Sequence, residues 1–79
     1  MIKIETGQYY VVLAEINTGI IVSLDGKRSY SSLNEVPNEI FSSLNEAEQF
    51  SQKKISELPD IECNIYNDKS ERVKVIVKG

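Results

Sequence analysis

The run of residues 8–16, QYYVVLAEI, constrains the fold of this chain more than any other stretch. Its β-branched and aromatic residues predict a β-strand. Successive residues of a strand point to opposite faces, so Tyr10 and Val12 share one face. Tyr9 and Val11 share the other. The strand is therefore apolar on both sides, although a single helix can cover only one face of a sheet.

Two turn signals divide the residues that follow into short strands. Asn17-Thr18-Gly19 and Asp25-Gly26 contain residues that tolerate the positive φ of a tight hairpin turn. We therefore expect residues 20–24 to return antiparallel to the first strand. Residues 27–31 should form a third strand that is shorter, more polar and at an edge of the sheet.

Residues 32–42, SLNEVPNEIFS, allow two interpretations. Pro37 could open a short helical turn. Alternatively, the segment could be an irregular crossover that brings Phe41 into the core. We favour the crossover.

A helix is predicted from Leu44 to Leu58. Ser43 and Glu46 form the S-x-x-E capping-box pattern at its start, and Pro59 ends it. One apolar stripe of this helix spans about 140°, which is typical of a helix that lies on a sheet. Its members are Leu44, Ala47, Phe50, Ile55 and Leu58.

Two polar residues interrupt this stripe. Ser51 falls near its centre, where a small side chain permits close approach to the sheet and its hydroxyl can donate to a carbonyl one turn earlier. Lys54 falls between Phe50 and Ala47. We expect its alkyl stem to pack at the rim of the helix interface while its ammonium group stays in water.

The C-terminal residues predict a second hairpin. Residues 61–67 alternate, with Ile61, Cys63 and Ile65 on the face toward the helix. A turn at residues 67–70 leads into a returning strand at residues 71–77. The inward residues of that strand are expected to be Val73, Val75 and Val77.

The order of elements is thus β-β-β-α-β-β. It predicts an α+β fold, an antiparallel sheet of about five strands with one helix packed on one face. We expect residues 1–79 to form a single domain. Residues 41–50 and 59–66 resemble segments of other short bacterial proteins, and this resemblance implies no activity.

The chain contains no histidine and one cysteine, Cys63. Ser-His-Asp and Cys-His arrangements are thereby excluded, and a zinc site would have only carboxylates and one thiol. The glycines are isolated, so no phosphate-binding glycine motif occurs. We expect no catalytic residue, no cofactor and no metal. Cys63 alternates with Ile61 and Ile65, which predicts an inert core residue.

Charge is unevenly distributed in this chain, whose net charge is −3. Residues 31–62 hold seven acids against two lysines, a net of −5, whereas residues 63–79 carry a net of +2. The acidic excess disfavours nucleic acid and favours a basic protein partner. The acids are Glu35, Glu39, Glu46, Glu48, Glu57, Asp60 and Glu62.

The N-terminal residues show no charged segment followed by a long apolar stretch. No window approaches the roughly 20 apolar residues that a membrane span needs. Together with the unpaired cysteine, these features predict a cytoplasmic protein that does not contact membranes.

The second apolar face of the sheet is the strongest functional hint. Residues expected there, away from the helix and available for binding, are Tyr10, Val12, Tyr66 and Ile76. The first hypothesis is a non-enzymatic protein-interaction domain, such as an inhibitor or immunity-type protein, that uses this face or the acidic segment. A homodimer would cover the same face. A partly exposed face without any partner fits the sequence equally well.

The alternative hypothesis is a small-ligand-binding module or accessory subunit. Its tyrosines would line a cleft between the sheet and the crossover. An enzyme is the least supported class, because the groups that most often carry catalysis are missing.

Overall fold

A computed structural model describes residues 4–23, 29–30 and 39–78 of the chain. The predicted Asp25-Gly26 turn lies outside the described residues. So do residues 31–38, which include Glu35, Pro37 and most of the expected crossover.

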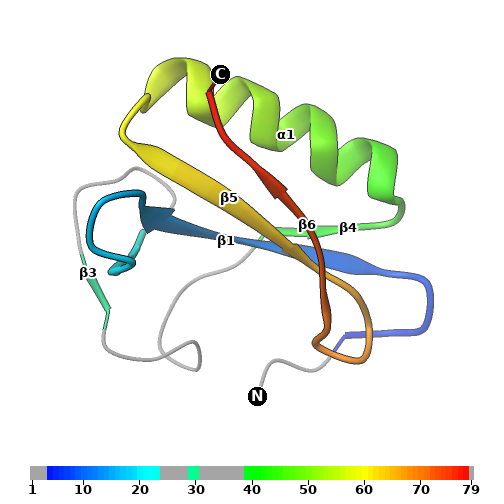
Figure 1. The fold of residues 1–79 in the computed structure, drawn as a ribbon. Coiled ribbons are helices and arrows are strands. Elements are labelled where there is room, and N and C mark those ends of the chain that lie inside the picture. The colour runs from blue at the N-terminus through cyan, green and yellow to red at the C-terminus, as the bar shows by residue number, and fades with distance from the viewer. Residues whose placement is uncertain (1–3, 24–28, 31–38, 79) are drawn as a thin grey trace.

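The predicted α+β architecture is confirmed (Figure 1). An antiparallel sheet with the strand order β3-β2-β1-β5-β6 carries a single described helix, α1, across one face. The strands are β1 (Tyr9–Glu15), β2 (Ile21–Val22), β3 (Ser29–Tyr30), β4 (Glu39–Phe41), β5 (Ile61–Tyr66) and β6 (Arg72–Ile76), and the helix is α1 (Leu44–Glu57). The chain order matches the predicted β-β-β-α-β-β apart from the additional short strand β4.

Strand β1 lies at the centre of the sheet. It pairs with β5 along one side and with both β2 and β4 along the other. Strand β4 replaces the end of the expected irregular crossover, because Glu39–Phe41 pair antiparallel with Tyr9–Val11. This pairing places Phe41 against the core, as expected, where its ring lies 5.1 Å from that of Phe50.

The first hairpin forms where the turn signal predicts it. Gly19 adopts a positive φ of 74°, and its N–H donates to the carbonyl oxygen of Glu15 at 2.8 Å. The N–H of Glu15 donates in turn to the carbonyl oxygen of Ile20 at 2.9 Å. A glycine suits this position because a side chain would strain the left-handed backbone. Strand β3 lies at the sheet edge, as predicted.

Helix α1 begins and ends at local signals that the sequence carries. The Ser43 side chain accepts a hydrogen bond from the Glu46 N–H at 3.2 Å. The Glu46 carboxylate accepts from the hydroxyl of Ser42 at 2.8 Å. At the other end the Leu58 N–H donates to a carbonyl one turn earlier, and Pro59 cannot extend the helix because it lacks an N–H.

The face of α1 toward the sheet is confirmed, with its most buried residues at Ala47, Ser51 and Ile55. The Ser51 hydroxyl donates to the Ala47 carbonyl oxygen at 2.8 Å, as expected for a polar residue at the centre of the stripe. Lys54 lies at the rim, where its Nζ is 5.7 Å from the Phe50 ring centroid and 3.6 Å from Glu57 Oε1.

The core lies between α1 and the face of the sheet that α1 covers. Strand β5 contributes the predicted alternation to it. The buried apolar residues of this core are Val11, Leu13, Val22, Ala47, Ile55, Ile61, Cys63, Ile65 and Ile76. The helix in the described part of the chain is too short and too polar to cross a membrane.

Candidate functional site

Three of the four predicted binding residues share the face of the sheet opposite α1. Tyr10 pairs with Tyr66, and Val12 pairs with Asn64, so their side chains point to one side. Tyr10 and Val12 are only 1% and 2% exposed, and Tyr66 is partly buried. Tyr10 and Val12 are therefore covered within the chain itself, in contrast to the open face expected from the sequence.

The fourth residue, Ile76, lies on the other face, so its predicted position is wrong. It pairs with Cys63, whose side chain points toward α1, and it is buried in the core. Val75 pairs with Asn64 and points away from the helix.

The expectation that the three valines of this strand point inward is wrong for the same reason. Val73, Val75 and Val77 are 45%, 39% and 48% exposed. Residues 73–77, VKVIV, could turn either the three valines or Lys74 and Ile76 toward the helix. The strand adopts the arrangement that buries the larger isoleucine.

A connected set of polar and aromatic groups occupies the face opposite α1. The rings of Tyr10 and Tyr66 stack with centroids 5.0 Å apart and an interplanar angle of 9°. Asn64 donates through Nδ2 to the Val12 carbonyl oxygen at 3.3 Å, and its Oδ1 accepts from Arg72 Nη1 at 3.3 Å. Burial raises the pKa of the Tyr66 phenol, Tyr10 raises it further, and Arg72 partly opposes the effect.

This face is hollowed beside these groups. The hollow, which we call the sheet-face depression, has a volume of about 290 Å³. Its lining includes the oppositely charged Arg72 and Glu62 and the apolar Val12, Ala14 and Ile21. A lining with both signs of charge beside apolar side chains suits a small molecule that carries both signs of charge.

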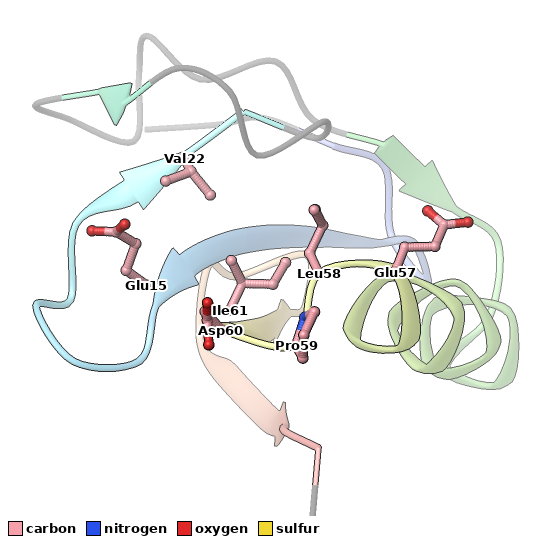
Figure 2. Close-up of a pocket in the computed structure, with 7 residues that line it drawn as sticks. All are labelled: Glu15, Val22, Glu57, Leu58, Pro59, Asp60 and Ile61. Atoms are coloured by element: carbon pink, nitrogen blue, oxygen red, sulfur yellow. The ribbon is translucent and has the colours of Figure 1, made fainter.

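A second pocket, of about 230 Å³, lies where α1 ends beside β1 and β2 (Figure 2). Its carboxylates belong to Glu15, Glu57 and Asp60, and Figure 2 shows Glu57 across the pocket from the other two. Within residues 4–23, 29–30 and 39–78 no group of three or more acidic, histidine or cysteine residues is arranged to hold a metal ion. The pocket therefore offers negative charge over an apolar floor rather than a set of metal ligands.

A third hollow, of about 280 Å³, runs between α1 and the residues at the end of β6. It is lined by Gln52, Ile55, Ser56, Val77 and Lys78, and we call it the helix–strand groove. Figure 1 shows β6 on the outside of the sheet, with the residues after it running beside the helix. The groove thus lies beyond the C-terminal end of β6, beside α1.

We call the side of β6 that faces away from β5 the outer edge of β6, since β6 is the last strand in the described order and pairs only with β5 there. The side chains along it combine the three exposed valines with three cations and no acid. The cations are Arg72, Lys74 and Lys78. Sequence reasoning missed this edge as a surface, although its alternation of valines with lysines is a known mark of edge strands.

Cys63 is buried, as predicted. Its Sγ donates to the Ser51 carbonyl oxygen at 3.8 Å. Burial raises the pKa of this thiol from 9.0 to about 11, although Ser51 and Lys54 lower it slightly. The thiolate that nucleophilic chemistry requires is therefore disfavoured at neutral pH.

The chain matches no protein family, no curated protein and no solved structure.

Proposed function

We propose that this chain is a small, non-enzymatic domain that binds another protein through the outer edge of β6. The exposure of the three valines there carries the proposal. Such an edge combines apolar side chains with backbone donors and acceptors that β5 does not use. Other chains bind edges of this kind by pairing with the backbone and covering the side chains.

The non-enzymatic part of the proposal is supported by the reactive groups that the chain offers. There is no histidine, and the one thiol, Cys63, is buried with a raised pKa. General acid–base and nucleophilic mechanisms at neutral pH most often use one of these two residue types.

Binding of a basic partner by the acidic segment, residues 31–62, has less support. Three of its acids already contact residues of the chain itself: Glu46 with Ser42, Glu48 with Lys74, and Glu57 with Lys54. An inhibitor or immunity-type role through the acidic segment therefore has less support than binding at the outer edge of β6.

Photo-crosslinking tests the proposal directly. A benzoylphenylalanine at Val75 should give crosslinks to a defined partner protein in the cells that produce this chain. The matched control places the same probe at Ile20, which is equally apolar and 44% exposed but lies on the hairpin between β1 and β2. The proposal is wrong if position 75 gives no crosslink, or if positions 20 and 75 give the same products in equal yield.

The sheet-face depression supports a second candidate, a small-ligand-binding module. Arg72 would pair with an acidic group of the ligand and Glu62 with an amino group, beside the apolar lining residues. Free amino acids carry both groups and are suitable probes. One or more should raise the melting temperature of the wild type but not of Arg72→Leu, and no shift with any of them would exclude the candidate.

A further inference from the structure

Strand β6 offers a second chain an unpaired backbone as well as side chains. In an antiparallel sheet, alternate N–H and C=O groups of an edge strand point away from its neighbour. For β6, the neighbour is β5, and the described residues provide no strand on the other side. An extended segment laid along this outer edge would therefore find hydrogen-bond partners already in strand geometry.

The two faces of β6 differ beside that edge. Toward α1 lie Lys74, whose ammonium group pairs with Glu48, and the helix–strand groove with Lys78. Lys78 has no ion pair or hydrogen bond with any described residue, so its charge is available. Away from α1 lies Val75, next to the exposed Val73. An added strand would meet Lys74 and Lys78 on the α1 side, and the two valines together with Arg72 on the other side.

Charge argues against a second copy of β6 as the occupant. In the two-fold symmetric antiparallel register centred on Val75, two segments that each carry Arg72, Lys74 and Lys78 and no acid would lie side by side. The register centred on Lys74 places two copies of Lys74 opposite each other, and the register centred on Ile76 places Lys74 opposite Lys78. Like charges directly opposite each other on paired strands are destabilising.

We infer that the outer edge of β6 binds an extended segment of another protein in which acidic and apolar residues alternate, and that this segment adds a strand to the sheet. The inference rests on the interaction role proposed above and specifies the partner. Its acidic side chains face Lys74 and Lys78 and enter the helix–strand groove. Its apolar side chains cover Val73 and Val75. Backbone pairing supplies affinity, and the two rows of side chains supply specificity.

Synthetic peptides test this chemistry without knowledge of the natural partner. The probe is a short capped peptide of alternating glutamate and valine, compared with a peptide of alternating lysine and valine. We expect the glutamate peptide to bind at least about tenfold more tightly, because several cross-strand charge pairs change from attraction to repulsion. In isotope-labelled protein, the β6 amides that point away from β5 should exchange more slowly in the complex. Added salt should weaken the binding.

A pair of protein variants with the same change in net charge isolates the edge. Lys78→Glu should weaken the binding of the glutamate peptide about fivefold, because it replaces a cation of the groove by an acid. Lys53→Glu makes the same change at an exposed position of α1 and should leave the affinity within about twofold. Both positions are at the surface, so both variants should fold.

Four results would overturn the inference. The lysine peptide could bind as tightly as the glutamate peptide, or Lys78→Glu and Lys53→Glu could have equal effects. A glutamate peptide N-methylated at alternate backbone nitrogens could bind as well as the unmodified one, which would exclude strand pairing. Light scattering could also find a dimer that Val75→Lys dissociates, which would make the second copy the occupant.

The inference can fail while the proposed function stands, and the two outcomes are distinguishable. If position 75 crosslinks to a partner but neither peptide binds, the edge binds a folded protein surface and the added-strand mode is wrong. If the glutamate peptide binds but no crosslink forms in cells, the edge has the predicted chemistry and the proposed cellular role is wrong.

Discussion

Strands β5 and β6 form one hairpin, and in the sequence of each strand apolar residues alternate with polar ones. Strand β5 lies between two partners and buries Ile61, Cys63 and Ile65 under α1. Among the described residues, strand β6 pairs only with β5, and its valines are exposed. The comparison shows that a two-residue period tells which residues share a face, whereas the position of the strand in the sheet decides whether that face is buried.

The two strands also differ in regularity. The register shifts between Ile65 and Tyr66, so that Lys74 lies opposite Ile65 and Arg72 lies opposite Tyr66. The intervening Val73 is an extra residue on β6. Because of it, Arg72 reaches Asn64 on one face while Lys74 reaches Glu48 on the other. The irregularity thus places cations on both sides of the outer edge.

The largest expected effect contrasts the interior of β5 with the exposed face of β6. Ile65→Ala should lower the free energy of unfolding by about 2–5 kcal/mol, because Ile65 is fully buried and the truncation leaves a cavity. Val75→Ala removes apolar carbon from an exposed position and should cost less than about 1 kcal/mol. Urea unfolding of both variants measures the difference. Equal losses would show that β6 contributes to the core as much as β5.

The elements that sequence reasoning placed correctly are set by local interactions. The helix start depends on Ser43 and Glu46, and the first hairpin depends on Gly19, each acting within a few residues. The phase of β6 depends instead on which residues of β5 it faces, and Val73 shifts that pairing. Strand β4 was missed because three residues paired with β1 carry too short a pattern.

The candidate surfaces were harder to predict than the fold. Tyr10 and Val12 were expected at an open face because one helix can cover one side of a sheet, yet both are buried on the other side. Burial there depends on tertiary contacts that a two-residue period does not encode. The outer edge of β6 could have been found from its lysines and arginine, since cations interleaved with valines favour an edge position.

The next effect concerns alkaline pH and the thiol at the centre of β5. Because the pKa of Cys63 is raised from 9.0 to about 11, the folded state binds its proton more tightly than the unfolded state. The resulting stability is fully present below pH 9 and is lost as the pH rises toward about 11, by roughly 3 kcal/mol in total. Unfolding free energies measured across this range should fall more steeply for wild type than for Cys63→Ala.

A second cysteine variant sharpens the same contrast. Val75→Cys on the Cys63→Ala background places a thiol on the exposed strand, where no comparable burial raises its pKa. If its unfolding free energy falls with pH as steeply as that of wild type, titration of Cys63 does not explain the loss of stability.

A smaller effect is expected from the polar side chain that connects β5 to both of its neighbours. Asn64 is buried and donates to the Val12 carbonyl oxygen on β1, while Arg72 on β6 donates to it. Asn64→Ala should cost about 1–3 kcal/mol, because a buried carbonyl loses its donor. The matched control is Asn67→Ala in the exposed turn, which also loses hydrogen bonds but leaves them replaceable by water. A larger loss for Asn67→Ala in thermal unfolding would contradict the account of Asn64.

The smallest expected effect belongs to the ion pair that links β6 to the helix. Lys74 and Glu48 form this pair, with side chains 50% and 28% exposed, so water and salt screen their attraction. Lys74→Ala should therefore change the free energy of unfolding by less than about 1 kcal/mol at low salt, and by less still at high salt. Urea unfolding at the two salt concentrations measures both values. A loss above about 2 kcal/mol that persists at high salt would mean that this contact holds β6 in place, and the outer edge would then be a stabilising element rather than a surface available to a partner.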